Sequence, residues 1–314
     1  MKSRTFAAAA LAIAGEIAFA APLAYVPNEE SGTISVIDTQ SDSVIKTIKA
    51  GKTPRGIATF KGGHTLYVSD QPNNALLVVD LDKQAVVDKI DLGESPEGVG
   101  MSADGRFVAA AVEISNSIAL IDTATKKRVA SIKVEGKNPE HAVFSPDGKW
   151  IFSSAEEATQ VDIIDLAQRK QVASVPVGRR PRGIGFLPDS SKAYVACELD
   201  STVYVIDVAK QAVLKSIKAG NFSNGVAVRP DGKRVYISNG KDATVSVIDT
   251  GSDEIIATIP VGKRPWNMAL TPDGKKLYVA AGRSNAVSVI DTEANQKLTD
   301  IPVGDKPWGV VIHD

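Results

Sequence analysis

Residues 265–304 read PWNMALTPDGKKLYVAAGRSNAVSVIDTEANQKLTDIPVG, and this stretch decides the fold. It contains four short segments rich in β-branched residues, it lacks a helical period, and turn-forming residues separate the segments. The Pro-Asp-Gly sequence at 272–274 is typical of a tight turn, because Pro presets φ, Asp bonds back to the backbone and Gly accepts a positive φ. The predicted strands cover residues 266–270, 277–280, 287–291 and 298–303.

The same unit recurs along the whole chain after residue 20. A Val-Ile-Asp-like motif repeats at intervals of 42 or 43 residues, and a proline marks the start of each unit except one, where Ser223 takes its place. The motif ends at Asp38, Asp80, Asp122, Asp165, Asp207, Asp249 and Asp291. The unit prolines are Pro54, Pro96, Pro139, Pro181, Pro265 and Pro307.

Repeated four-stranded units of this length are typical of a β-propeller. We predict an all-β, seven-bladed propeller that fills residues 21–314 as one domain, with antiparallel blades. The repeat begins with a second strand at residues 24–26 and ends with a first strand at 308–312. The ring is therefore expected to close in a shared blade, in which the C-terminal strand lies innermost and three N-terminal strands complete the sheet.

The first twenty residues have the pattern of a secretory signal peptide. Lys2 and Arg4 precede an apolar run of about eleven residues at 5–15, and Ala18-Phe19-Ala20 offers a cleavage site. The run is shorter than the roughly 20 residues that span a membrane, and no cysteine follows it to carry a lipid. We therefore predict a periplasmic or secreted bacterial protein without a membrane anchor.

Composition narrows the possible functions. The net charge is −1, which provides no field for nucleic acid, so we expect no nucleic-acid partner. A single cysteine, Cys197, excludes an internal disulfide and CxxC metal sites, and its strand context predicts a buried residue. A closed ring has no need to dimerise, so a monomer is expected.

The residue after each unit proline should form a ring at one mouth of the central channel. This ring is chemically uneven although the framework repeats, and we predict a ligand site there. The ring contains Arg55, Glu97, Glu140, Arg182, Asn224, Trp266 and Trp308. Four neighbours in the chain complete the candidate site: Arg180 and Arg264 precede the prolines, and His141 and Asn267 replace the glycine that usually follows.

Two interpretations of this ring are open. In the first, Trp266 and Trp308 stack on a small, anionic and partly planar ligand, while Arg180, Arg182 and Arg264 hold its carboxylate or phosphate. In the second, arginines and glutamates of neighbouring blades form ion pairs that tie the ring, and the tryptophans pack between blades.

Metal binding and catalysis have weaker support in the sequence. Glu97, Glu140 and His141 could share a divalent metal, although satisfied polar side chains are the simpler interpretation. The seven repeated aspartates are expected to cap turns, because identical copies indicate a structural role. Motifs of serine hydrolases, phosphate loops and zinc proteases are absent from the sequence.

The segments AYVPN at 24–28, TISVIDT at 33–39 and IPVG at 259–262 resemble the YVTN-family β-propeller repeat. The closing PWGVV at 307–311 and the seven-unit layout resemble exported propellers associated with PQQ-dependent alcohol catabolism. This resemblance implies a secreted or periplasmic seven-bladed propeller, in a family whose members mostly have no established catalytic activity. Together with the ring at the channel mouth, it leads us to expect a non-enzymatic protein that binds a small molecule or a periplasmic protein, as an accessory to quinoprotein-dependent oxidation. Because tryptophan-docking repeats are absent, we expect no bound PQQ and no other cofactor. The alternative is a metal-dependent hydrolase similar to propeller lactonases.

Overall fold

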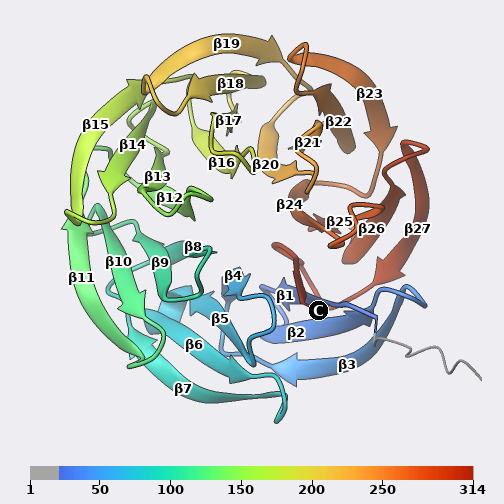
Figure 1. The fold of residues 1–314 in the computed structure, drawn as a ribbon. Helices are drawn as coiled ribbons and strands as arrows, with labels where there is room; N and C mark the ends of the chain where they lie inside the picture. The colour runs from blue at the N-terminus through green and yellow to red at the C-terminus, as the bar shows by residue number, and fades with distance from the viewer. Residues whose placement is uncertain (1–20, 314) are drawn as a thin grey trace, which may run out of the picture.

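Seven four-stranded antiparallel sheets surround a central axis, as predicted from the sequence (Figure 1). The computed structural model describes residues 21–313. The predicted signal peptide, residues 1–20, lies outside the described residues. Within residues 21–313, no helix has the length and apolar character needed to cross a membrane.

Six blades are continuous in sequence, and each runs from its innermost to its outermost strand. Blade 1 contains β4 (Pro54–Thr59), β5 (Thr65–Asp70), the 3-10 helix η1 (Gln71–Asn73), β6 (Ala75–Asp80) and β7 (Ala85–Asp91). Blade 2 contains β8 (Pro96–Met101), β9 (Phe107–Val112), β10 (Ser117–Asp122) and β11 (Lys127–Lys133). Blade 3 contains β12 (Pro139–Phe144), β13 (Trp150–Ala155), β14 (Gln160–Asp165) and β15 (Lys170–Pro176).

Blades 4 to 6 follow the same order. Blade 4 contains β16 (Pro181–Phe186), β17 (Lys192–Cys197), β18 (Thr202–Asp207) and β19 (Ala212–Lys218). Blade 5 contains β20 (Ser223–Val228), β21 (Arg234–Asn239), β22 (Thr244–Asp249) and β23 (Glu254–Pro260). Blade 6 contains β24 (Pro265–Leu270), β25 (Lys276–Ala281), β26 (Ala286–Asp291) and β27 (Gln296–Pro302). The four strands predicted for this unit all exist, and their ends differ from the predicted ones by at most two residues.

Blade 7 closes the ring by joining the two ends of the described chain. Its strand order is β28 (Val311–His313), β1 (Leu23–Asn28), β2 (Thr33–Asp38) and β3 (Ser43–Lys49). The predicted closure is therefore confirmed, and Figure 1 shows the blue N-terminal strands beside the red C-terminal segment.

The closing strand is shorter than the predicted span of 308–312. Pro307 bridges Asn28, and regular pairing resumes only where Val311 faces Tyr25. Between these two pairs, the C-terminal segment has one more residue than β1. The same extra residue occurs at the start of the other innermost strands, as between Pro54 and Ile57 in blade 1. The local irregularity thus belongs to the repeat, and it interrupts the regular ladder in blade 7.

Polar turns end the strands as the sequence predicts. In each unit the repeated aspartate accepts a hydrogen bond from a backbone N–H two or three residues later, as Asp38 does from Gln40 at 2.9 Å. The glycine of the Pro-Asp-Gly turn has a φ of 69° at Gly274, the left-handed region that favours glycine. Ser190 replaces this glycine in blade 4 and keeps a φ of 60°.

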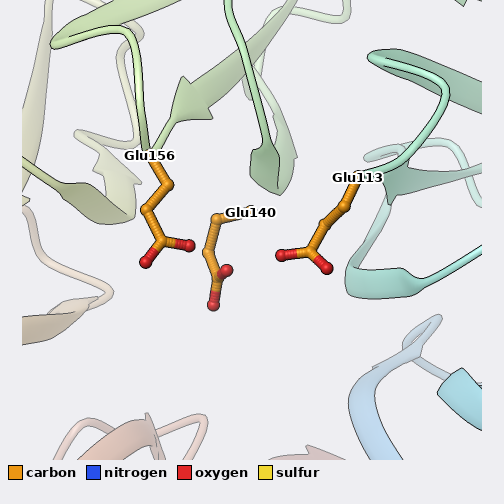
Figure 2. A group of neighbouring side chains, drawn as sticks. All are labelled: Glu113, Glu140 and Glu156. Carbon is orange, nitrogen blue, oxygen red and sulfur yellow. The ribbon is translucent and has the colours of Figure 1, made fainter.

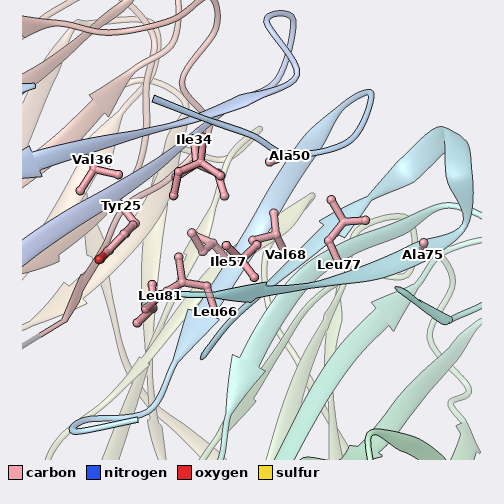
Figure 3. Close-up of a cluster of buried hydrophobic side chains, with 12 residues drawn as sticks. Tyr25, Ile34, Val36, Ala50, Ile57, Leu66, Val68, Ala75, Leu77 and Leu81 are labelled. Atoms are coloured by element: carbon pink, nitrogen blue, oxygen red, sulfur yellow. The ribbon is translucent and has the colours of Figure 1, made fainter. Parts of the chain in front are cut away.

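The hydrophobic core lies between neighbouring blades. Where blade 7 meets blade 1, Tyr25, Ile34 and Val36 pack with Ile57 and Leu77 in one buried cluster (Figure 3). Equivalent clusters fill the other six blade interfaces, so the hydrophobic contacts of each blade are made with its two neighbours. Cys197 is completely buried in one of them, as predicted.

Deletion of residues 305–314 should open the ring. The deletion removes β28 and the backbone bonds that Glu29, Glu30 and Pro27 make to residues 305–308, so it exposes the edge of β1. We expect a loss of at least about 3 kcal/mol in the free energy of unfolding, on the scale of one lost buried side-chain cluster. Urea unfolding followed by circular dichroism measures it, and an unchanged midpoint would contradict the closure.

Candidate functional site

The seven residues that follow the unit prolines, or Ser223 in blade 5, surround one mouth of the channel. We call this set (Arg55, Glu97, Glu140, Arg182, Asn224, Trp266 and Trp308) the inner ring. All seven line a cavity of about 270 Å³. Arg180, Arg264 and Asn267 line it as well, so the structure brings together ten of the eleven candidate residues.

His141 is the exception among the candidate residues. It is buried, and its ring packs against Trp308 with 5.6 Å between ring centroids. It borders a separate cavity of about 140 Å³ beneath the mouth. Burial, aided by the charge of Arg182, lowers the pKa of His141 to about 3, so the imidazole is neutral. His141 therefore supports the wall of the site from behind.

Sequence reasoning missed a second ring, formed by the residue directly after the second strand of each blade. The same spacing of 42 or 43 residues would have revealed it, because its members are equivalent in the repeat. This second ring contains Glu29, Gln71, Glu113, Glu156, Glu198, Gly240 and Gly282. Four of its five larger side chains line the same cavity, and Glu198 lies fully buried behind it.

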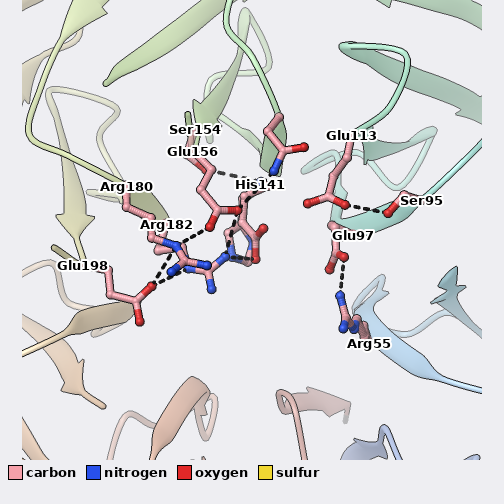
Figure 4. A network of polar contacts seen from close by, with 12 residues as sticks. Arg55, Ser95, Glu97, Glu113, His141, Ser154, Glu156, Arg180, Arg182 and Glu198 are labelled. Carbon is pink, nitrogen blue, oxygen red and sulfur yellow. Dashed lines mark hydrogen bonds and ion pairs between the residues drawn. The ribbon is translucent and has the colours of Figure 1, made fainter. Parts of the chain in front are cut away.

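Arg182 is the centre of an ion-pair network that joins blades 3, 4 and 6. Its guanidinium lies 2.7 Å from Glu140, 3.3 Å from Glu156 and 3.1 Å from Glu198 (Figure 4). Glu198 also binds Arg264 of blade 6 at 2.6 Å. Burial alone would lower the pKa of Arg182, but the three carboxylates together raise it.

This network bears on the two interpretations of the arginines that the sequence leaves open. Arg180, Arg182 and Arg264 are each paired with glutamates of the protein, as the ion-pair interpretation of the ring requires. Removing Arg182 would leave carboxylates buried without compensation, which typically costs about 3–5 kcal/mol. An Arg182→Ala variant should therefore lose stability, so a loss of ligand binding in this variant would not by itself show that Arg182 contacts the ligand.

A second network joins blades 7, 1 and 2 on the opposite side of the mouth. Arg55 binds Glu29 at 2.9 Å and also pairs with Glu97, and Gln71 donates to the same Oε1 of Glu97 at 2.5 Å. Glu97 is only 2% exposed. Burial and then the charge of Glu140 raise its pKa to about 9, although Arg55 acts in the opposite direction. Glu97 is consequently a protonated acid near neutral pH.

Three buried polar atoms of the inner ring have no hydrogen-bond partner within residues 21–313. They are Nε of Arg55, Oε2 of Glu97 and Nδ2 of Asn224. Glu97 and Asn224 are at least 97% buried while lining the cavity. An unpaired buried polar atom costs about 1–3 kcal/mol. Other blades have different residues at the equivalent positions, so the fold does not require Glu97 or Asn224 there.

Carboxylates are concentrated on one side of the cavity. Glu113, Glu140 and Glu156 each place one oxygen within 4.8 Å of the other two (Figure 2). They come from blades 2 and 3, together with Glu97. The metal set expected from the sequence, Glu97, Glu140 and His141, is not the set that converges, because His141 lies beneath the mouth.

Glycines of the second ring make room for large side chains on the other side. A Cβ on Gly282 would lie 2.3 Å from the Trp266 ring, and one on Gly240 would lie 2.8 Å from the Arg264 guanidinium. Trp266 occupies the space left by the glycine of its own blade, and Arg264 occupies the space left by the glycine of blade 5. Trp266 and Arg264 therefore depend on glycine at these two positions.

A family model described as "Lactonase, 7-bladed beta-propeller" matches residues 16–173 and 164–304 of the chain. The chain belongs to this family. The narrower resemblance to YVTN repeats and to PQQ-associated propellers stays a prediction. A comparison with curated proteins finds no match.

Solved structures share the fold at low sequence identity. Hydrazine synthase of Kuenenia stuttgartiensis has a TM-score of 0.78 at 24% identity, over 85% of this chain and 92% of that chain. A functionally unknown protein from Desulfotomaculum acetoxidans has a TM-score of 0.82 at 17% identity, over 93% and 98% of the two chains. The dihydro-heme d1 dehydrogenase NirN in complex with DHE has a TM-score of 0.69 at 17% identity, over 95% and 77%. At these identities the likeness concerns the fold alone.

Stability should fall with rising pH through Glu97. Its folded pKa of about 9 exceeds the ordinary value of 4.5, so the protonated form contributes stability that is fully present below pH 4.5 and lost as pH rises toward 9. Glu97→Gln should remove this part of the pH dependence and flatten the slope of unfolding free energy by about 1–3 kcal/mol between pH 5 and 9. Urea titrations at several pH values measure the slope, with exposed Glu94→Gln as the control. Parallel slopes for both variants would refute the assignment.

Gly282→Ala should displace Trp266 from the cavity wall. The new methyl group would overlap the indole ring, which typically costs about 1–3 kcal/mol. Tryptophan emission should shift and the urea midpoint should fall. Gly251→Ala, in a turn whose Cβ would meet only an Asp249 oxygen at 3.3 Å, should change neither. Identical behaviour of the two variants would show that the Trp266 contact is not close.

Proposed function

We propose that this protein binds a small hydroxy acid, or the lactone of one, in the cavity at the mouth of its channel. The observation that carries the proposal is the pair of unpaired buried groups, Glu97 Oε2 and Asn224 Nδ2, in the cavity wall. Leaving both groups without a hydrogen-bond partner costs free energy, and a ligand that hydrogen-bonds to them would remove this cost.

The two sides of the cavity differ in a way that suits this ligand class. Blades 2 and 3 contribute the carboxylates Glu97, Glu113, Glu140 and Glu156, which accept hydrogen bonds from hydroxyl groups. Blades 5 and 6 contribute the amides of Asn224 and Asn267 beside Arg264, which donate to a carboxylate or carbonyl. The cavity volume of about 270 Å³ is near the lower end of typical ligand sites and limits the ligand to a small molecule.

We place this function outside the cytoplasm, as a binding protein without turnover. Export rests on the pattern of residues 1–20, and the absence of turnover rests on the lack of hydrolase motifs in the sequence. A role beside quinoprotein-dependent oxidation rests on the resemblance of the closing sequence alone.

Calorimetric titration with gluconate tests the proposal, because gluconate has both hydroxyl groups and a carboxylate. Sorbitol lacks the carboxylate and hexanoate lacks the hydroxyl groups, so both should bind at least tenfold more weakly. At 100 times its dissociation constant, gluconate should add about 2.7 kcal/mol to stability. Equal binding of all three compounds, or of none, would refute the ligand class.

An Asn224→Leu variant separates function from folding. Leucine has nearly the same shape and removes the unpaired Nδ2, so stability should stay equal or rise while gluconate binding is lost. Retained binding would move the site away from Asn224.

Lactone hydrolysis is the second candidate, and the protonated state of Glu97 favours it. Water would attack the lactone carbonyl and pass a proton to Glu140, while Glu97 would donate its proton to the leaving ring oxygen. The products are the open hydroxy acid and an enzyme with the proton moved from Glu97 to Glu140. A pH-stat assay with glucono-1,5-lactone tests this, and acceleration above the blank that is lost in Glu97→Gln would favour catalysis over binding alone.

A further inference from the structure

A groove with a cavity of about 570 Å³ lies beside the channel mouth, between loops of the neighbouring blades 5 and 6 (Figure 1). Its charged lining residues are all cationic: Lys241, Lys263, Arg264 and Arg283. Within residues 21–313, no carboxylate lines it. We call it the basic groove, and it shares only Arg264 with the cavity at the channel mouth.

Three of the four charges in the basic groove are uncompensated. Arg264 pairs with the buried Glu198 at 2.6 Å. Among the described residues, no ion pair or hydrogen bond reaches the side-chain nitrogens of Lys241, Lys263 or Arg283, and all three residues are exposed. A cleft lined by one sign of charge concentrates ions of the opposite sign, so this groove attracts anions.

The repeat provides an internal comparison for Lys263. Its equivalent in blade 4 is Arg179, whose backbone N–H donates to Asp200 at 2.6 Å and whose guanidinium pairs with the same carboxylate at 2.7 Å. In blade 6, Ser284 stands at the position of Asp200. Its hydroxyl accepts the Lys263 N–H at 2.7 Å but cannot neutralise the ammonium group. The loop contact is therefore kept, while the charge of Lys263 stays uncompensated.

Phe222 positions two of the cations. Its ring centroid lies 5.6 Å from Nζ of Lys241 and 5.5 Å from the Arg264 guanidinium, and Arg264 also lies 5.9 Å from the Trp266 ring. An aromatic face attracts a cation without removing its charge. The two rings thus support cations, whereas sites for single-stranded nucleic acid offer free rings on which bases stack.

The positive surface continues toward blade 7. An adjoining cavity of about 560 Å³ shares Arg264 and Arg283 with the basic groove and adds Lys306. Among the described residues, the one carboxylate that lines it is Glu30, which pairs with Lys306 at 3.5 Å. Each of the two cavities alone has the size of a ligand site, so together they suit an extended chain better than a compact small molecule.

We propose that the basic groove binds an acidic peptide segment of a partner protein. Carboxylates spaced along an extended chain can face Lys241, Lys263 and Arg283 in turn, and exposed charges of this kind give specificity and fast association. This inference goes beyond the proposed binding of a hydroxy acid, because it depends on residues outside the mouth cavity. Peptide binding and gluconate binding can therefore fail independently.

Fluorescence anisotropy with a labelled octa-glutamate peptide tests the proposal, and an octa-glutamine peptide with the same label is the neutral control. At about 20 mM NaCl the acidic peptide should bind at least tenfold more tightly than the neutral one. At about 200 mM NaCl this affinity should fall at least tenfold, because salt screens exposed charges. A labelled oligothymidylate of equal length should bind more weakly than the acidic peptide.

Matched charge reversals locate the site. Lys263→Glu and Arg283→Glu should each weaken binding of the acidic peptide at least about fivefold, and both should stay folded because neither side chain is paired. Lys233→Glu, an equal change of net charge at an exposed residue of the β20–β21 turn, should bind the peptide as the unmodified chain does. Gluconate binding should be the same in all three variants.

Ser284→Asp is an independent test of the same charge. It gives blade 6 the aspartate that neutralises Arg179 in blade 4, so it should weaken peptide binding while thermal stability stays equal or rises. A folded Ser284→Asp variant and a folded Lys263→Glu variant that both bind as the unmodified chain does would overturn the proposal. The same holds for equal binding of the acidic and neutral peptides, for no binding of either, for equal losses in Lys263→Glu and Lys233→Glu, and for tighter binding of the oligothymidylate.

Discussion

The pairing of β28 with β1 is the interaction on which the ring depends. Leu23 to Tyr25 pair with Val311 to His313, so residues almost 290 positions apart share one sheet. Each blade is stabilised by its two neighbours, and without this pairing the first and last blades would each lose one interface. The cavity needs the same closure, because Glu29, Lys306 and Trp308 reach it from blade 7.

Side chains reinforce the closure at a distance from the paired strands. Lys276 of blade 6 binds Asp42 of blade 7 at 2.7 Å, and Tyr278 also donates to Asp42. Asp253 makes the same pair of contacts between blades 5 and 4, with Lys192 and Tyr194. The interface between blades 6 and 7 thus uses a pair of contacts that also occurs between blades 4 and 5, inside the continuous part of the chain.

The fold could be predicted from the sequence because it depends on local features that recur. The aspartate at the end of each third strand and the glycine of the Pro-Asp-Gly turn act within a few residues, so a single unit predicts them all. The inner ring was predictable for the same reason, since the residue after each proline has the same place in every blade. The length of β28 was not, because it depends on how many residues pair with β1, a strand from the other end of the chain.

The chemistry of the site was harder to predict because it is set between blades. Sequence alone left both interpretations of Arg182 open, and its three glutamate partners come from two rings in blades 3 and 4. His141 occupies a position in the repeat beside the inner ring, yet packing against Trp308 turns it away from the cavity. Spacing gives the place of a residue in a blade but not its partner in the next blade.

The second ring explains why large aromatic and basic side chains occupy the wall of the mouth at blades 5 and 6, where blades 2 to 4 have glutamates. Blades 2, 3 and 4 place glutamates after their second strands, whereas blades 5 and 6 place Gly240 and Gly282 there. A glycine in this ring leaves space that Arg264 and Trp266 occupy, as their close approach to these glycines shows. The chemical asymmetry of the cavity therefore follows from two small residues in an otherwise regular repeat. A molecule bound there would face carboxylates on one side and hydrogen-bond donors on the other. This distribution of acceptors and donors would set its orientation.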